Sequence, residues 1–232
     1  MIRTEHILAS VFWSAATIVL YLLARIVHRR WPRWWSSPLM VTPVFLMVIA
    51  LALHVGYRDY SRGTHWLIAL LGPATVAFAI PIYEQRALIR RYRLVLFFGV
   101  LLGSATAMAS AWALATTLGL SGSLRLSLLP RSVSTPFAMA VSGDIGGVPD
   151  LTAVFVCFTG VFGAALGEGM LALLPLRSGM ARGTLFGMGA HGAGVVKAHQ
   201  VGPEEGSIAG LVMVLAGLVN VLAAPLLAAL LR

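Results

Sequence analysis

Long apolar runs alternate with short polar gaps along this chain. The runs cover residues 7–28, 39–57, 66–83, 94–120, 151–176 and 207–231, and shorter interrupted runs cover 128–142 and 183–200. A helix needs about 20 apolar residues to cross a bilayer, and inside lipid the backbone must satisfy its own polar groups. The pattern predicts an all-α, polytopic integral membrane protein with about seven or eight membrane segments. We expect one transmembrane domain over residues 1–232, and we consider an internal repeat relating residues 1–120 to 121–232.

Three of these segments contain helix breakers at membrane depth. Residues 66–83 include Gly72-Pro73 and Pro81, residues 128–142 include Pro136, and residues 183–200 carry a glycine-rich stretch around His191. Irregular backbone is tolerated in a membrane only where protein buries it or water reaches it. We therefore expect broken or re-entrant helices at 66–83, 128–142 and 183–200. Two alternatives remain open: the breakers only kink packed helices, or 128–142 is an ordinary span.

The composition excludes several classes of protein. Of the 232 residues 59% are hydrophobic and 11% charged, and the mean hydropathy is +0.88. A soluble domain has about a quarter of its residues charged, so neither a soluble fold nor a disordered chain is expected. Cys157 is the one cysteine, and the six histidines are scattered. No disulfide framework, metal site or cofactor is predicted, and no nucleophile elbow or Walker loop points to an enzyme.

The charge pattern predicts an orientation. The net charge is +9, and arginines fill the gaps after the first and third runs: Arg29, Arg30 and Arg33, then Arg86, Arg90, Arg91 and Arg93. Basic loops lie on the cytoplasmic side, which places the N-terminus outside. The acidic stretch from Asp144 to Asp150 then falls outside and Arg177 and Arg182 inside. Nucleic-acid binding is not expected, because no soluble stretch could form a reading module.

The segment at 128–142 offers groups suited to an anion. Its candidate substrate-binding residues are Arg131, Ser132, Ser134, Thr135 and Pro136. A broken helix presents free N–H groups and partial positive charge at its start, and the guanidinium fork of arginine matches a carboxylate. The alternative for Arg131 is that its side chain extends to the membrane interface.

Further candidates lie in the other interrupted segments and in the long run at 151–176. For substrate binding these are Thr75, Gly189, His191, Gly192 and Lys197, and for ion or proton coupling Glu168 and His191. An ionisable group inside a membrane is costly and therefore points to function, and histidine changes charge near neutral pH. Other roles remain open: a neutral hydrogen-bonded His191, a Lys197 that reaches a headgroup, and a Glu168 that pairs with a basic residue.

Several short motifs together resemble the LrgB/CidB family. They are Leu71-Gly72-Pro73-Ala74-Thr75-Val76-Ala77, Pro130-Arg131-Ser132-Val133-Ser134-Thr135-Pro136-Phe137-Ala138, Ile145-Gly146-Gly147, Leu151-Thr152-Ala153-Val154-Phe155, Gly189-Ala190-His191-Gly192 and Glu205-Gly206. Their order covers about residues 60–230. The chain departs from the family pattern in three places: Arg131 replaces a common lysine, Ala190 a serine, and Gly194-Val195 a Gly-Thr pair.

The resemblance implies a protein of the bacterial cytoplasmic (inner) membrane that works with a small LrgA/CidA-type membrane protein. It also implies either of two functions. We expect a secondary transporter of small monocarboxylates (the pyruvate, lactate, glycolate or glycerate class) that works by alternating access. The rival is a holin-like or antiholin-like oligomer that modulates murein hydrolase export and cell lysis. A homo-oligomer is compatible with both.

Overall fold

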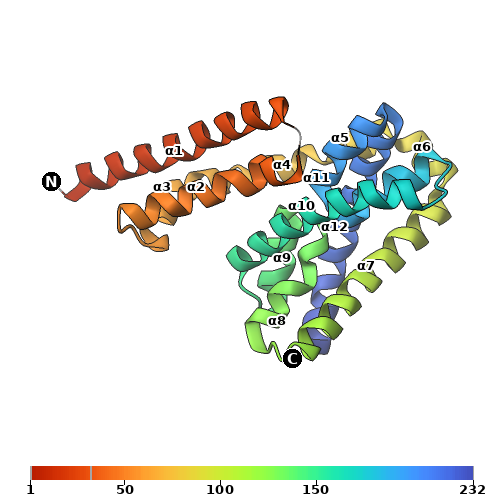
Figure 1. The fold of residues 1–232 in the computed structure, drawn as a ribbon. Helices are drawn as coiled ribbons and strands as arrows, with labels where there is room; N and C mark the ends of the chain where they lie inside the picture. The colour runs from red at the N-terminus through yellow and green to blue at the C-terminus, as the bar shows by residue number, and fades with distance from the viewer. Residues whose placement is uncertain (1, 32, 232) are drawn as a thin grey trace. The chain divides into compact units, whose positions relative to one another are not determined.

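The computed structural model describes residues 2–31 and 33–231, with side chains from residue 9 onward. Every regular element in this part of the chain is a helix, as predicted. The chain divides into two compact units, Met1–Ala74 and Thr75–Arg232, and Figure 1 labels their helices. The internal repeat considered for residues 1–120 and 121–232 stays a prediction.

The first unit holds helices α1 (Ile2–Arg30), α2 (Pro38–Ala52) and α3 (Tyr57–Ala69), with the short η1 (Trp34–Ser36) before α2. α1 packs against both α2 and α3. Two hydrogen bonds join α1 to α3: Trp66 Nε1 donates to Ser14 Oγ at 2.7 Å, and Ser14 Oγ donates to the carbonyl of Gly63 at 3.1 Å. The first two apolar runs of the sequence are therefore helices, as predicted.

The segment at 66–83 is broken into short helices, as predicted. α3 is followed by α4 (Leu71–Ala77), α5 (Ala79–Glu84) and α6 (Arg86–Arg91). The linking residues Leu70 and Phe78 keep right-handed helical dihedrals, with φ/ψ of −69°/−14° and −64°/−12°. Pro73 and Pro81 lack the N–H that would continue the helix. Taken together, residues Tyr57–Glu84 are still long and apolar enough to cross a membrane.

Three long helices form the frame of the second unit: α7 (Arg93–Thr117), α10 (Pro149–Leu173) and α12 (Pro203–Leu231). At 1.5 Å per residue they are about 37 to 44 Å long, enough to cross a core of about 30 Å. Within the described residues five helical stretches meet the length and composition of a membrane span: Ala9–Arg30, Tyr57–Glu84, α7, α10 and α12. The predicted total of seven or eight segments also needs α2 and the interrupted segments, and it stays a prediction.

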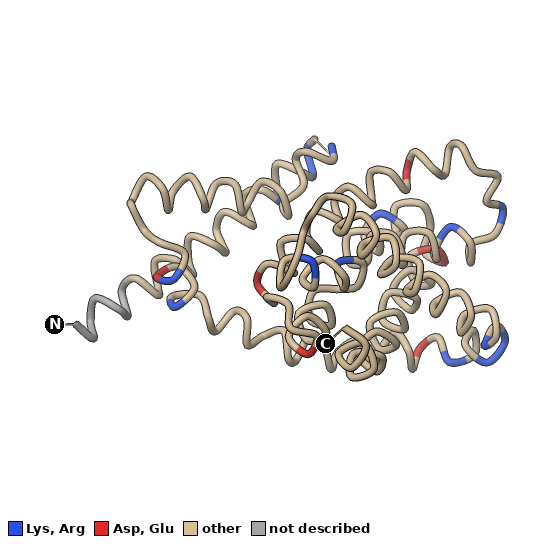
Figure 2. Tube along the Cα trace, turned by 90° about the horizontal axis from the view of Figure 1, so that it is seen from below, with Lys and Arg blue, Asp and Glu red and all other residues tan. Residues whose placement is uncertain are grey.

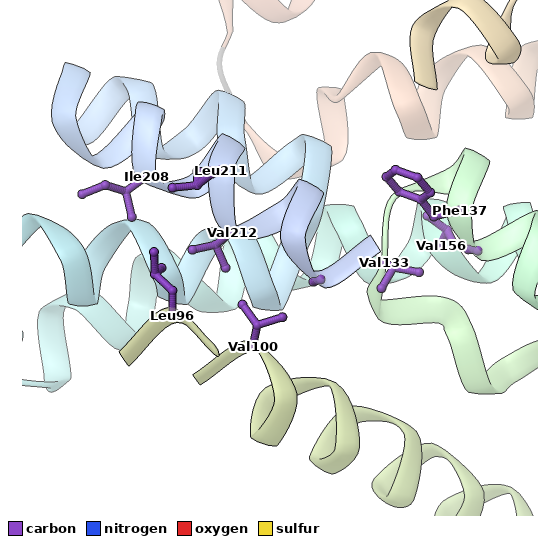
Figure 3. Packing of buried hydrophobic residues seen from close by; sticks show 10 residues of the cluster. Leu96, Val100, Val133, Phe137, Val156, Ile208, Leu211 and Val212 are labelled. Atoms are coloured by element: carbon purple, nitrogen blue, oxygen red, sulfur yellow. The ribbon is translucent and has the colours of Figure 1, made fainter. Parts of the chain in front are cut away.

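The core of the second unit joins these helices to the interrupted segment at 128–142. Figure 3 shows Leu96 and Val100 of α7 and Ile208, Leu211 and Val212 of α12 in one buried cluster with Val133, Phe137 and Val156. Charged residues gather at helix ends, and long stretches of the trace carry none (Figure 2). Exposed apolar side chains such as Leu222 and Leu166 line the outer faces of the long helices, as expected of a surface solvated by lipid.

Candidate functional site

The segment at 128–142 lies within a hairpin whose two ends are next to each other. α8 (Gly122–Leu128) and η2 (Leu129–Ser132) lead into it, Val133 and Ser134 are extended, and α9 (Thr135–Ile145) leads out. The backbone N–H of Val148 donates to Ser127 Oγ at 2.8 Å, across 21 positions of sequence. α9 has 11 residues, about 16 Å, and is too short to span a bilayer. We call residues 127–148 hairpin A.

Buried hydroxyl groups close the mouth of hairpin A. Thr152 Oγ1 donates to the hydroxyl of Ser142 at 2.7 Å and lies 3.0 Å from the carbonyl oxygen of Ser127. These three side chains are fully buried. Gly146 ends α9 with φ +90°, a left-handed conformation that suits glycine. The chain thereby turns directly from α9 into α10, and the predicted break at 128–142 is confirmed.

The segment at 183–200 forms a second hairpin. Helix α11 (Gly179–Val201) is interrupted at His191, where φ is +38° and ψ −122°. A Cβ atom placed on Gly194 would collide with the carbonyl oxygen of Phe186, so the two legs lie side by side. Both ends of α11 lie beside the start of α12: Arg182 pairs with Glu205 at 3.2 Å, and the ring of His199 covers Gly206. The predicted interruption is thus confirmed, and we call residues 179–201 hairpin B.

The two hairpins open at opposite ends of the second unit. Residues at the mouth of hairpin A, Leu126 and Ile145, pack near the end of α12 around Ala224 and Leu231. The mouth of hairpin B lies at the start of the same helix, beside Glu205 and Gly206. Since α12 has 29 residues, the mouths are separated by most of a membrane thickness. Each hairpin therefore enters the helical frame from its own end.

Glycines on α10 allow hairpin B to approach closely. A Cβ on Gly160 would lie 2.8 Å from the ring of His191, and one on Gly167 would lie 2.8 Å from the ring of Phe186. One on Gly163 would collide with the carbonyl oxygen of Gly189. Small residues are the common means of close helix packing in membranes. The first leg of hairpin B thus runs antiparallel along α10, from Gly167 towards Gly160.

The tips of the two hairpins meet inside the unit. Val133 at the tip of hairpin A belongs to the same buried cluster as Val156 of α10, and Met188 of hairpin B packs against that cluster. His191, at the tip of hairpin B, also interacts with the backbone of Val156. Beside this junction lies a cavity of about 10 Å³, lined by Ser104, Ala107, Met108, Leu129, Pro130, Ser132, Val133, Met188 and Asn220. That volume is about right for one water molecule.

The residues predicted at 131–136 lie at the tip of hairpin A. Ser132 lines the cavity, and Arg131, half-buried, donates to its hydroxyl oxygen at 3.4 Å. Within the part of the chain that the structure describes, Arg131 has no carboxylate within ion-pair distance. Ser134 is 6% exposed, and its hydroxyl has no described hydrogen-bond partner. Thr135 and Pro136 form the first turn of α9, which leaves N–H groups without helical acceptors.

The remaining candidates lie at four different places in the structure. His191 lies at the tip of hairpin B, 5% exposed, and its Nε2 atom has no described partner. Lys197 forms an ion pair with Glu168 at 2.9 Å, linking α10 to the second leg of hairpin B. Gly189 and Gly192 are exposed, and a Cβ on either would meet open space. Thr75, on α4, does not line the cavity.

Eight of the nine cavity residues were not predicted as site residues, among them Ser104, Met188 and Asn220. Asn220 is a lone amide in the long apolar run of α12, and its Nδ2 donates to Ser104 Oγ at 2.9 Å. Both side chains are buried. A polar amide in the middle of a spanning helix is itself a signal of function, and this signal could have directed attention to α12.

Comparison with known proteins identifies the family. The family model described as the LrgB-like family matches residues 17–230. This chain belongs to the LrgB-like family. The family resemblance predicted from the motifs is therefore confirmed, and the chain is a membrane protein of this family.

Relatives match along nearly the whole chain. The uncharacterized protein YwbG of Bacillus subtilis is 41% identical over 211 residues, which cover 91% of this chain and 94% of YwbG. The uncharacterized protein YxaC of the same organism is 33% identical over 210 residues, which cover 90% of this chain and 91% of YxaC. The holin-like protein CidB of Staphylococcus epidermidis is 27% identical over 220 residues, 95% and 96%. No solved structure matches.

Proposed function

We propose that this LrgB-like protein is a secondary transporter of small monocarboxylates in the bacterial cytoplasmic membrane. The substrate class comprises pyruvate, lactate, glycolate and glycerate. The carboxylate would meet the Arg131 guanidinium, the hydroxyls of Ser132, Ser134 and Thr135 and the free N–H groups of α9. The tip of hairpin B, with His191 and its neighbouring glycines, would form the opposing wall.

One observation carries this proposal: two interrupted hairpins open at opposite ends of α12, and their tips meet beside Val156. Discontinuous helices in separate parts of a chain are the best pointer to a transporter site. Two buried polar atoms for which the described residues offer no partner, Ser134 Oγ and His191 Nε2, lie at these same tips. Leaving such groups unsatisfied costs about 1–3 kcal/mol each, a cost that a bound ligand would offset.

The same geometry supports alternating access. The cavity of about 10 Å³ is far smaller than a monocarboxylate, so the entry of a substrate would require the hairpin tips to move apart. Because each hairpin has its own mouth, the opening of hairpin A would expose the tips to one side and that of hairpin B to the other. By the charge rule, hairpin A opens outside, hairpin B opens to the cytoplasm, and the N-terminus lies outside.

Uptake into proteoliposomes tests the proposal. We expect saturable uptake of labelled pyruvate, lactate or glycolate by the purified protein, measured with and without an LrgA/CidA-type partner. Arg131→Ala should lower uptake at least about tenfold, since a hydrogen bond to a charged group contributes about 1.5–3 kcal/mol. Arg58→Ala, a charge removed from the exposed surface of α3, is the matched control. Full uptake by Arg131→Ala would reject the proposed site.

A holin-like oligomer is the second candidate, and the similarity to the holin-like protein CidB favours it. This function needs self-association and a lesion in the membrane, with no solute pocket. Leakage of dyes of increasing size from liposomes separates the two functions. A transporter retains every dye and shows saturable uptake, whereas a holin releases dyes without saturation.

A further inference from the structure

The cavity beside the hairpin tips is built from four elements that converge on one point. Ser104 comes from α7, Ser132 from η2, Met188 from the first leg of hairpin B, and Asn220 from α12. Ser104 is 7% exposed and Asn220 3%. The rest of the lining is apolar, and ligand sites commonly combine apolar walls with a few convergent polar groups.

The two serine hydroxyls have capacity to donate into this cavity. Ser104 Oγ accepts from Asn220 Nδ2 at 2.9 Å, and Ser132 Oγ accepts from the guanidinium of Arg131 at 3.4 Å. A hydroxyl carries one donor and two acceptor sites, and no described group accepts the proton of either. Asn220 and Arg131 therefore orient two O–H groups and leave their protons for a bound acceptor.

Met188 fills the space next to this pair. A Cβ on Gly103 would lie 2.9 Å from the terminal methyl carbon of Met188 and 3.5 Å from its sulfur. A side chain at position 103 would therefore displace the flexible end of Met188. Methionine has three rotatable bonds and adapts readily to a change in packing. A rotation of Met188 would enlarge the cavity without a movement of the backbone.

From this arrangement we infer that the cavity extends the proposed carboxylate site from Ser132 to Ser104, whose hydroxyl donates to the acid. Asn220, whose amide protons go to Ser104 and to the carbonyl of Ala216, holds the Ser104 hydroxyl in place. Met188 is the residue that sets the size of the acid. The inference rests on the proposed transport function and adds to it two residues, Ser104 of α7 and Asn220 of α12, that lie outside the sequence motifs. The acid displaces the Met188 side chain, so the non-carboxylate end of the acid lies against hairpin B.

Binding of labelled acids to the purified protein in detergent, together with uptake, tests this inference. We expect Ser104→Ala to weaken pyruvate binding about tenfold, as for a lost hydrogen bond to a charged group. We expect Met188→Ala to improve the binding of a branched 2-oxo acid relative to pyruvate by about tenfold or more. Leu222→Ala, on the exposed face of α12, is the control and should change neither value.

The outcomes separate this inference from the transport function. If the wild type neither binds nor transports any of these acids, both are rejected. The wild type could instead bind pyruvate while Ser104→Ala and Met188→Ala show the same pyruvate affinity and the same size preference as the wild type. In that case only the subsite is rejected. Tighter binding of larger acids by Met188→Ala supports the subsite, because a misfolded protein would not gain affinity for them.

Discussion

Ser127 and Val148 lie 21 positions apart in sequence, yet the N–H of Val148 donates to the Ser127 hydroxyl oxygen at 2.8 Å. This hydrogen bond fixes the beginning and the end of hairpin A at one level of the fold. On the far side of the unit, the Arg182–Glu205 ion pair ties the first leg of hairpin B to α12. The protein thus encloses two short, interrupted segments between three long helices.

The hydroxyl network at the mouth of hairpin A should contribute measurably to stability. Thr152→Val keeps the shape of the side chain but removes its bonds to Ser142 and Ser127. We expect a loss of about 1–2 kcal/mol in the free energy of unfolding, measured by unfolding in detergent. Thr116→Val is the control, because its hydroxyl bonds only within its own helix, at an exposed position. Equal losses in the two variants would contradict the role of the network.

Close packing of α10 on hairpin B should make Gly163 intolerant of any side chain. Gly163→Ala places a Cβ against the backbone of Gly189, and overpacking of this kind costs about 1–3 kcal/mol. Gly169→Ala on the same helix meets open space and should have no such cost. The measurement is the unfolding temperature of both variants. An unchanged value for Gly163→Ala would show that hairpin B lies elsewhere.

The backbone at His191 should favour glycine over alanine. Its φ of +38° lies in a region that costs a non-glycine residue about 1–3 kcal/mol. His191→Gly and His191→Ala both delete the imidazole, but only glycine relieves the strain. We therefore expect the glycine variant to be the more stable by about 1 kcal/mol. An alanine variant more stable than the glycine variant would indicate a continuous helix and would exclude a hairpin tip at position 191.

The ion pair between Lys197 and Glu168 should act as a structural link. Lys197→Gln or Glu168→Gln alone leaves one charge without its partner, while the double substitution removes both. We expect each single variant to lower uptake and the double variant to restore it. The double-mutant cycle should give a coupling free energy of about 1 kcal/mol. If Lys197 instead binds the substrate, the double variant remains inactive.

The sequence predicted most of the fold because spanning helices depend on length and apolarity alone. The breaks at 128–142 and 183–200 followed from Pro136 and from the glycines around His191. The breaks in 66–83 followed in the same way from Gly72-Pro73 and Pro81. The Ser104–Asn220 pair was missed because it joins residues 116 positions apart, a contact that no local pattern encodes.

The central claim is that the two hairpins enter the membrane from opposite faces. Single cysteines at positions 121, 144, 178 and 200, introduced into the Cys157→Ser protein, test it through labelling with a membrane-impermeant maleimide from each side of the membrane. The account predicts that positions 121 and 144, on either side of the tip of hairpin A, react from the outer face. Positions 178 and 200, at the ends of hairpin B, should react from the cytoplasmic face. Labelling of 121 and 144 from opposite faces, or of all four from one face, would contradict it.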